Sequence, residues 1–419
     1  MAGARRPGVR ATFLAAGLAV PSLSSVHGQA LITASMEILV ITWNYPPRQG
    51  GMEQLLASVC AGLSKNHRVS VVTAYADRHL TAGEESVFRP ASPGLIRYFL
   101  FAFTKGFALL CGNRNISVVF GGSVLVTPIV LVLARLFRRK AIVQAHGLDL
   151  IYGNSVYQCF IVGWLGHVDR VIANSRHTAR LAQQKGVTER ALEVIPPGVD
   201  CERFQVAESA DALKATRGLA NRKVILFVGR LARRKGVKEF IEHSLVEIVK
   251  QVPEVCFGIA GDNPAESLTE HEDVAAEIRQ AIERHELSGY VRWFGAVSDA
   301  ELVQLYALCD VVVLPVLDLH ADVEGFGMVA LEAAAASKPV IATRCGGIPD
   351  AVEDRESGIL VEPGNRDRLS EAIVSLLKNP RTAAIMGQSG RRRAVKEFTW
   401  SSVVSRYEAA FRRLSEGAN

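Results

Sequence analysis

The amino-acid sequence predicts an α/β protein with two Rossmann-like domains, each built on a parallel sheet. From Met36 onward, short apolar segments rich in β-branched residues alternate with longer stretches of helical character. Apolar segments without polar alternation are typical of parallel strands that helices cover on both faces. The alternation occurs in two runs separated by a polar stretch over 200–222. We therefore expect two domains that face a cleft between them.

The first run predicts a parallel sheet with a helix after most strands. Its expected strands cover 37–42, 68–73, 116–120, 140–145, 170–173 and 192–195. Its expected helices cover about 51–65, 94–111, 127–138, 155–166 and 176–185.

The second run repeats this pattern from Lys223 onward. Its expected strands cover 223–228, 255–260, 291–294, 310–314, 339–342 and 358–361. Its expected helices cover about 237–251, 270–286, 299–307, 327–336, 367–377 and 381–395.

These two runs set the expected domain boundaries. The N-terminal domain covers 36–200 and the C-terminal domain covers 222–397. An amphipathic helix over 400–415 is expected to return to the first domain. A chain of 419 residues is too long for one ordinary core, which agrees with this division.

Residues 1–35 are expected to be a leader or an extension outside the fold. Arg5 and Arg6 precede an apolar run over 11–23, a pattern that resembles a signal peptide. Met36 begins a sequence typical of a first buried strand, so an upstream extension is the alternative, and we favour Met36 as the start of the folded protein.

Composition narrows the class of protein. Hydrophobic residues make up 49% of the chain and charged residues 21%, which indicates a globular protein. The net charge is +6, and three arginines in residues 1–35 account for half of it. This excess is too small to indicate a nucleic-acid partner, but it suits anionic ligands or an anionic membrane surface.

The cysteines indicate a reducing compartment, which favours the cytoplasm. The chain has seven of them, an odd number, without CxxC spacing. A disulfide framework or a zinc site is therefore not expected. The seven are Cys60, Cys111, Cys159, Cys201, Cys256, Cys309 and Cys345.

Two loops of the first run are candidates for a binding site. The loop YPPRQGG (45–51) follows the first strand, and Gly50 and Gly51 let the backbone approach a ligand at the start of a helix. It lacks the GxGxxG spacing of a dinucleotide site, and a plain strand–helix turn is the alternative. His146, in QAHGLD (144–149), stands at another strand end. The alternative for His146 is a packed or surface histidine.

Other polar motifs of the first run have structural explanations. Ser175, in NSRHT (174–178), is expected to cap the next helix. The segment IPPGVD (195–200) is expected to close the first domain.

A cationic loop follows the first strand of the second run. In LFVGRLARRKG (226–236), Arg230 and Lys235 flank a short loop and suit a diphosphate. Arg233 and Arg234, between them, are expected to be solvated. An ordinary basic surface loop is the alternative.

The segment from Glu324 to Val352 carries the most specific pattern. Gly325, Phe326 and Gly327 lead into a helix whose free amides favour a phosphate. Glu332 lies in the second turn of that helix among alanines, where a carboxylate needs a polar partner. A second glycine pair follows the next strand. The alternative for Glu324 is an acid that interacts with the helix dipole.

No metal site is expected. Asp318 and Asp322 do not have the DxD spacing of a metal-binding carboxylate pair, because three residues separate them.

On these motifs the sequence resembles glycosyltransferase family 4, whose members are retaining, nucleotide-sugar-dependent enzymes of the GT-B fold. The resemblance covers about residues 36–415 and rests on the paired glutamates together with GRLARRKG, with support from YPPRQGG and HGLD. The segment DVEGFGMVALEA, from Asp322, resembles the lipid-acceptor mannosyltransferases of that family, the phosphatidylinositol mannoside type.

The resemblance implies roles for individual residues. Arg230 and Lys235 would hold the donor diphosphate, and Glu332 would bind the ribose hydroxyls. Glu324 would hold the donor sugar and phosphate. Backbone amides would assist Glu324, namely those of Phe326, Gly327 and Met328.

Other parts of the donor would meet the strand ends. Gly51 would lie near the donor phosphate, and His146 would contact the donor sugar at the reaction centre. The base would be read mainly by backbone near Gly295 and Val297.

The expected function is a retaining, metal-independent glycosyltransferase. It would move a hexose from GDP-mannose or a UDP-sugar to a lipid-linked or polysaccharide acceptor, with no cofactor beyond the donor co-substrate. Two alternatives stay open. One is a glycoside hydrolase that uses Glu324 and Glu332 as its carboxylate pair. The other is a nucleotide-sugar or carbohydrate-binding protein without turnover.

Two apolar segments bear on the acceptor. Residues 95–110 have Arg97 and Lys105 at their flank, and residues 124–137 end in three cations over 138–140. Both suit peripheral contact with anionic lipid on the cytoplasmic membrane face. Ordinary amphipathic helices packed on a sheet are the alternative.

Overall fold

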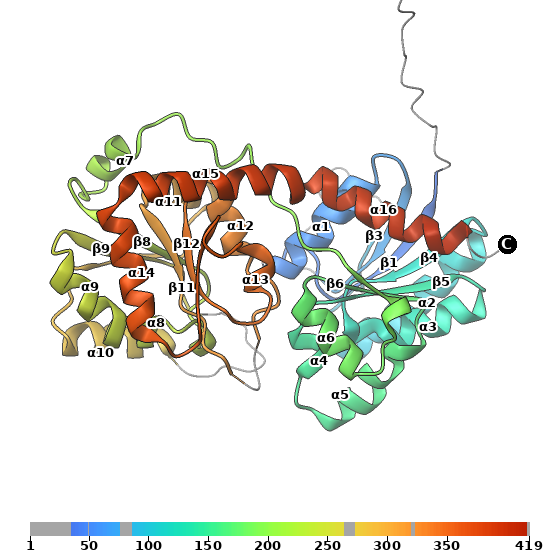
Figure 1. The fold of residues 1–419 in the computed structure, drawn as a ribbon. Coiled ribbons are helices and arrows are strands. Elements are labelled where there is room, and N and C mark those ends of the chain that lie inside the picture. The colour runs from blue at the N-terminus through green and yellow to red at the C-terminus, as the bar shows by residue number, and fades with distance from the viewer. Residues whose placement is uncertain (1–34, 49, 76–85, 264–272, 320–322, 417–419) are drawn as a thin grey trace, which may run out of the picture. The chain divides into compact units, whose positions relative to one another are not determined.

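The computed structural model describes residues 35–48, 50–75, 86–263, 273–319 and 323–416. The predicted leader, apart from Ser35, and Asp322 lie outside these residues. The domain boundaries remain predictions, and the two sheets are described in turn (Figure 1).

The first sheet is parallel throughout and has the strand order β3-β2-β1-β4-β5-β6-β7. Val40 of β1 lies opposite Val71 of β2 and Phe120 of β4. The strands are β1 Glu37–Ile41, β2 Arg68–Val72, β3 Val87–Phe88, β4 Ile116–Gly121, β5 Lys140–Ala145, β6 Arg170–Ala173 and β7 Leu192–Val194.

Helices cover both faces of this sheet because its strands are apolar on both sides. Leu39 and Ile41 belong to a core with α2, α3 and η2, whereas Ile38 and Val40 belong to a core with α1 and α16. The helices are α1 Gly51–Leu63, α2 Leu95–Gly112, η1 Val124–Val126, α3 Thr127–Leu136, α4 Leu148–Ile151, α5 Ser155–Phe160, η2 Val162–His167, α6 Arg176–Gln184, η3 Glu189–Ala191 and α16 Trp400–Glu416.

The C-terminal helix α16 is part of the first sheet's core. The ring of Phe120 on β4 packs 6.1 Å from Tyr407 and 5.3 Å from Phe411, measured between centroids. The Tyr407 hydroxyl donates a hydrogen bond of 2.7 Å to Gln144 Oε1 on β5. The last helix therefore closes the first sheet domain although it follows the second in sequence.

The second sheet is also parallel and has the order β10-β9-β8-β11-β12-β13. Val224 and Leu226 of β8 pack in one core and Ile225 and Phe227 in another, so both faces are again covered. The strands are β8 Lys223–Val228, β9 Val255–Ala260, β10 Val291–Gly295, β11 Val311–Leu314, β12 Val340–Thr343 and β13 Gly358–Val361.

The helices of the second sheet alternate with its strands. The expected helix over 237–251 is π-helical in its middle turn, η5. The elements are α7 Ala210–Thr216, η4 Arg233–Lys235, α8 Val237–Glu239, η5 Phe240–Leu245, α9 Val246–Gln251, α10 Val274–Arg284, α11 Asp299–Leu308, α12 Met328–Ala335, α13 Ile348–Ala351, α14 Arg366–Lys378 and α15 Pro380–Glu397.

Each predicted strand is confirmed within one residue at either end. The sequence prediction missed β3, α7 and the short helices α4, α13, η1, η3 and η4. β3 has only two residues. α7 lies in the stretch taken as a polar boundary, but Ser209 caps it by accepting a bond from the Ala212 amide, and Lys214 is buried against Asp310 at 2.7 Å.

Candidate functional site

The candidate site lies at the ends of β8 and β11. These two strands are neighbours in the second sheet, so the loops that follow them lie side by side. The loop after β8 carries Lys235, whose Nζ lies 2.6 Å from Oε2 of Glu324. The guanidinium of Arg234 forms an ion pair with the same oxygen. All three side chains are nearly buried, at 11%, 12% and 13% exposed for Lys235, Arg234 and Glu324. We call these three residues the cationic cluster.

The charges of the cluster are strongly coupled. Burial raises the pKa of Glu324, but the charges and hydrogen bonds of Lys235 and Arg234 outweigh burial and hold this pKa at about 2. Burial lowers the pKa of Lys235, and the pairing with Glu324 offsets only part of this decrease. Arg230, which is exposed, is close enough to lower the pKa of Lys235 further. One carboxylate among three cations leaves an excess of positive charge that suits a diphosphate.

The expectation that Arg234 is solvated was wrong. The short turn η4 directs Arg234 and Lys235 inward, while Arg230 and Arg233 are exposed. Gly236 ends this turn at φ 67°, and a Cβ there would lie 2.0 Å from the Pro315 carbonyl oxygen. The Leu317 amide also donates a bond of 2.7 Å to the Arg234 carbonyl. The turn is therefore fixed to the residues after β11. Arg234 and Lys235, on its inner side, reach Glu324.

The second glycine pair supports the loop that carries Glu324. The Gly347 amide donates a bond of 2.8 Å to the Glu324 carbonyl. A Cβ at Gly346 would lie 2.1 Å from the Glu324 carbonyl oxygen, and one at Gly347 would lie 2.1 Å from that of Gly325. Glycine is needed at both positions because the two backbones touch.

The helix α12 begins beside this loop. Gly327 stands before its first residue at φ 90°, and no side chain caps the helix. The free amides at this end favour an anion. The buried ring of Phe326 packs 6.2 Å from that of Phe398, which holds the approach to the helix.

A second uncapped helix start lies close by. α1 begins at Gly51 without a side-chain cap, and a Cβ at Gly51 would lie 3.4 Å from Cγ of Met328. The Glu53 carboxylate lies against Gly50, since its Oε2 would lie 2.5 Å from a Cβ at Gly50. Glu53 is buried and accepts a bond of 2.8 Å from Asn44 Nδ2. Glu53 and Asn44 position the loop, and no motif in the sequence pointed to them.

The polar partner expected for Glu332 is Tyr306. The Tyr306 hydroxyl donates a bond of 2.8 Å to Oε2 of Glu332. Burial raises the pKa of Glu332. The hydrogen bond from Tyr306 lowers this pKa, but by less than burial raises it. Burial, followed by the charge of Glu332, raises the pKa of Tyr306 well above its usual range. In the sequence, Tyr306 fits the apolar face of a helix, so nothing in the sequence indicated that it would bond to Glu332.

His146 is buried at the end of β5. Its Nε2 lies 2.9 Å from the Gly122 carbonyl oxygen, and since a carbonyl only accepts, Nε2 carries the hydrogen. The His146 carbonyl oxygen would lie 2.2 Å from a Cβ at Gly325, so the glutamate loop and this strand end are in contact. Asn174 Nδ2 also donates to that carbonyl at 3.3 Å.

The remaining predicted positions lie at other strand ends. Gly295 ends the edge strand β10 at φ 68°, with open space where a Cβ would be. Val297 packs at the rim of a core cluster. Ser175 caps α6 as predicted, since its side chain accepts a bond of 3.0 Å from the Thr178 amide.

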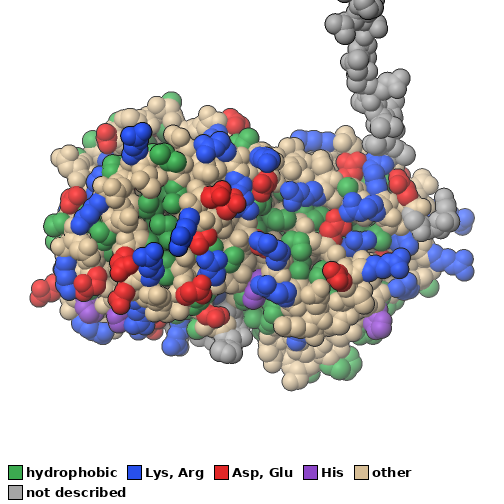
Figure 2. All heavy atoms as spheres, in the orientation of Figure 1, with side chains coloured by type: hydrophobic (Ala, Val, Ile, Leu, Met, Phe, Trp, Pro, Cys, Tyr) green, Lys and Arg blue, Asp and Glu red, His purple; other side chains and the backbone are tan. Residues whose placement is uncertain are grey.

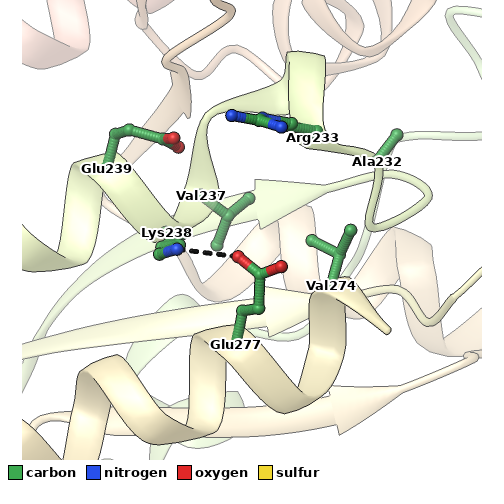
Figure 3. A pocket seen from close by; sticks show the side chains of 7 residues that line it. All are labelled: Ala232, Arg233, Val237, Lys238, Glu239, Val274 and Glu277. Atoms are coloured by element: carbon green, nitrogen blue, oxygen red, sulfur yellow. Dashed lines mark hydrogen bonds and ion pairs between the residues drawn. The ribbon is translucent and has the colours of Figure 1, made fainter. Parts of the chain in front are cut away.

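A small pocket lies on the outer side of the same cationic loop (Figure 3). Its volume of about 210 Å³ is below the roughly 300–1,000 Å³ of most ligand pockets. Lys238 in its wall is paired with Glu277 at 2.7 Å, and Glu239 also lines it. The two cations of the lining, Arg233 and Lys238, are balanced by Glu239 and Glu277, so the pocket has no excess of positive charge for a diphosphate.

Within the described ranges, no group of three or more His, Cys, Asp or Glu side chains is placed to hold a metal ion. Asp318 is described but Asp322 is not, so the spacing argument for these two acids stays a sequence argument.

Two parallel sheet domains with a buried cationic cluster beside an uncapped helix define a glycosyltransferase of the GT-B class. Family models agree with this class in both halves of the chain. The model described as Glycosyl transferases group 1 matches residues 210–393. The model described as Glycosyltransferase Family 4 matches residues 49–203.

Two curated relatives are similar over most of the chain. A GDP-mannose-dependent alpha-(1-6)-phosphatidylinositol monomannoside mannosyltransferase of Mycolicibacterium smegmatis is 30% identical over 376 residues, covering 87% of this chain and 95% of the relative. A protein of the same name from Mycobacterium tuberculosis is 27% identical over 382 residues, covering 88% and 96%. The chain belongs to the family 4, group 1 glycosyltransferases.

Solved structures share the fold at lower identity. Anabaena HepE in complex with UDP-glucose has a TM-score of 0.73 and 22% identity, covering 90% of this chain and 100% of HepE. Sucrose-phosphate synthase from Thermosynechococcus elongatus has a TM-score of 0.74 and 22% identity, covering 91% and 100%. These likenesses show the GT-B fold.

Proposed function

We propose that this glycosyltransferase moves mannose from GDP-mannose to a phosphatidylinositol mannoside or a related glycolipid, with retention at the anomeric carbon and without a metal ion. The observation that carries the proposal is the buried cluster of Arg234, Lys235 and Glu324 beside the uncapped start of α12. The donor and the acceptor are proposed because relatives similar over most of the chain have them in their names.

The proposed chemistry depends on the leaving group. As the glycosidic bond breaks, positive charge grows on the sugar and negative charge grows on the nucleoside diphosphate. Interactions that are stronger at this stage than with the bound donor accelerate the reaction. Arg230, Arg234, Lys235 and the amides of α12 would supply such interactions without a metal. Glu324 would keep two of these cations in place and face the sugar.

The other end of the donor would meet Glu332. A carboxylate whose Oε2 is already bonded to Tyr306 has its second oxygen for a ribose hydroxyl. In a retaining transfer the acceptor hydroxyl attacks on the leaving-group face and the departing phosphate oxygen takes its proton. This route uses no dedicated base from the chain.

The cationic cluster argues against a hydrolytic role for the two glutamates. A glycoside hydrolase needs one ionised carboxylate and one carboxylic acid that stays protonated near neutral pH. The pKa values of Glu324, about 2, and of Glu332, which burial raises, differ in that direction. Hydrolysis has no diphosphate leaving group, however, so Arg234 and Lys235 would have no role in it.

A lipid-linked acceptor would also place the enzyme peripherally on the cytoplasmic face of a membrane.

The test is a transfer assay with the full chain. GDP-mannose, UDP-glucose and UDP-galactose are each supplied with phosphatidylinositol monomannoside in detergent, with and without EDTA. We expect a mannosylated lipid only with GDP-mannose, at the same rate in EDTA, and an α-linkage by NMR. Transfer from a UDP-sugar alone would replace the donor proposal, and loss of activity in EDTA would replace the metal-independent one.

A further inference from the structure

One part of the chain is almost free of acidic residues. Residues 86–168 contain eight Lys and Arg but a single acid, Asp149. The carboxylate of Asp149 is turned to the backbone, where it accepts bonds from the amides of Val124, His146 and Gly147. By contrast, acidic and basic side chains intermingle over the second sheet domain in the view of Figure 2.

The helix α2, within this part, is apolar on both faces. Tyr98, Ala102 and Leu110 of its inner face are buried in the first sheet's core. Its outer face carries an apolar stripe at helical spacing, Ile96, Leu100, Phe103 and Phe107, which are 77%, 64%, 38% and 40% exposed. Among the described helices, α2 is also the one long and apolar enough to cross a bilayer by length and composition. Because its inner face belongs to the core, α2 is a core helix with an unpartnered outer face.

The apolar stripe continues onto the neighbouring helices. The ring of Phe107 lies 5.2 Å from that of Phe137, just after α3. Leu136 and Val132 of α3 are exposed, and together with Trp164 they line an open apolar groove. Phe160 and Val156 of α5 extend the surface and are 63% and 66% exposed. Figure 1 shows α2, α3 and α5 on the same side of the first sheet, opposite α16.

This surface holds most of the exposed apolar side chains of the protein. Of the thirteen large hydrophobic residues that are exposed among the described residues, ten lie on it. An exposed apolar patch of this size marks an interaction site. We call these ten residues the docking face: Leu95, Ile96, Leu100, Phe103, Phe107, Val132, Leu136, Val156, Phe160 and Trp164.

Cations surround the docking face. Arg97 and Arg138 are exposed, and Arg135 extends to the His167 carbonyl. Lys105 lies over the ring of Phe88 at 3.9 Å. None of these four forms an ion pair with a carboxylate of the described residues. Apolar side chains ringed by unpaired cations suit the interface of a bilayer with anionic headgroups.

The inner face of α2, opposite the docking face, is connected to the candidate site. Tyr98 of α2 packs 5.1 Å from Trp43, and the guanidinium of Arg48 lies 4.8 Å from the Trp43 ring. The loop that carries Arg48 ends at Gly51, where an added Cβ would lie 3.4 Å from Cγ of Met328 at the start of α12. A headgroup in a bilayer that contacts α2 would thus lie near the donor site.

We propose that the docking face binds the surface of a bilayer that contains anionic lipid and so delivers the lipid acceptor to the donor site. The delivery role rests on the proposed function, but the binding of the bilayer does not. No other occupant has the same support, since neither a second copy of this chain nor a soluble partner explains why the surface lacks acids.

The test measures binding of the full chain to sedimented vesicles, without donor. Vesicles contain phosphatidylcholine alone or phosphatidylcholine with phosphatidylglycerol. The variant is Ile96→Gln, Leu100→Gln and Phe107→Gln together, which leaves the inner face of α2 intact. The matched control is Ile385→Gln with Val395→Gln, two exposed apolar positions on α15. A second variant, Arg97→Gln with Arg138→Asn, is paired with Arg381→Gln and Arg392→Gln, two exposed arginines of α15.

We expect wild-type protein to bind the anionic vesicles and to release them at high salt. The docking-face variant should bind at least roughly tenfold more weakly. The arginine variant should lose the preference for anionic lipid, and both controls should bind as wild type does. Unchanged binding by the docking-face variant would overturn the proposal. So would a wild-type dimer in solution that this variant converts to a monomer.

A transfer assay in detergent separates the two proposals. If the docking face acts only on bilayers, the docking-face variant keeps wild-type transfer to a detergent-solubilised acceptor and loses it on vesicles. If wild type binds vesicles but transfers no sugar to any acceptor, the proposed function fails and the docking face stands.

Discussion

Lys235 Nζ and Glu324 Oε2 lie 2.6 Å apart, with both side chains nearly buried, at the ends of two neighbouring strands. The strands are far apart in sequence, so the pair ties the cationic loop to the glutamate loop. Arg234 binds the same oxygen. The Glu324 carboxylate therefore holds the cations of Arg234 and Lys235 beside the start of α12.

The first prediction separates two adjacent arginines. Arg234→Ala should lower kcat roughly 100-fold, the usual cost of removing one charge-stabilising group from a reaction centre. Arg233→Ala, one residue away and exposed, should change kcat less than about threefold. Steady-state kinetics with the donor measures both. Equal losses in the two variants would mean that Arg234 acts only as a basic surface residue.

The second prediction concerns pH and stability. The pKa of Glu324 is lowered from 4.5 to about 2. Its ionised form therefore stabilises the fold fully above pH about 4.5, and this contribution is lost as pH falls toward 2. Glu324→Gln should lower the free energy of unfolding at neutral pH by an amount on the order of 3 kcal/mol at most. The deficit should shrink as pH falls through the same window.

Urea unfolding of wild type and Glu324→Gln across this pH range measures the effect. The control is Glu371→Gln on α14, which is 62% exposed beside Arg368. A deficit that is constant with pH would show that Glu324 contributes by packing and not by charge.

The third prediction tests the ribose role of Glu332. Glu332→Ala should raise the donor Michaelis constant at least roughly tenfold, because a hydrogen bond to a charged group contributes about 1.5–3 kcal/mol. Tyr306→Phe should raise it less, since the carboxylate remains but loses its buried partner. An unchanged Michaelis constant in Glu332→Ala would remove the ribose assignment.

The fourth prediction uses the glycine contact behind Glu324. In Gly347→Ala the new Cβ would lie 2.1 Å from the Gly325 carbonyl oxygen, so the glutamate loop must shift. We expect a loss of about 1–3 kcal/mol in the free energy of unfolding together with a loss of turnover. Gly112→Ala, where no atom lies within 4 Å of the added Cβ, should leave both unchanged. Normal turnover in Gly347→Ala would show that the loop position tolerates displacement.

The sequence predicted the sheets well because their strands are buried on both faces and read as unbroken β-branched runs. It singled out Glu324, Lys235 and the helix start of α12 for a similar reason, since glycines and charged residues at strand ends stand out against apolar neighbours. The structure pairs Glu324 with Lys235, and the roles of these residues toward a donor remain predictions. The exception is the pairing of cations. Which arginine of the loop turns inward depends on the turn η4, and the turn is set by the contact of Gly236 with Pro315.

Contacts between distant segments could not be predicted. Tyr306 and Glu332 are on different helices, and the contact of Gly346 and Gly347 with the glutamate loop depends on how β12 ends. The roles assigned to Gly50, Gly51, His146, Gly295 and Val297 remain predictions, because their positions at strand ends are compatible with a ligand but do not require one.

The most direct test of the central claim compares the affinities of GDP and guanosine by calorimetry. In wild type we predict that GDP binds much more tightly than guanosine, since the cationic cluster recognises the diphosphate. In the double variant Arg234→Ala, Lys235→Ala the two affinities should become similar, with guanosine unaffected. A double variant that keeps the full preference for GDP would contradict the account.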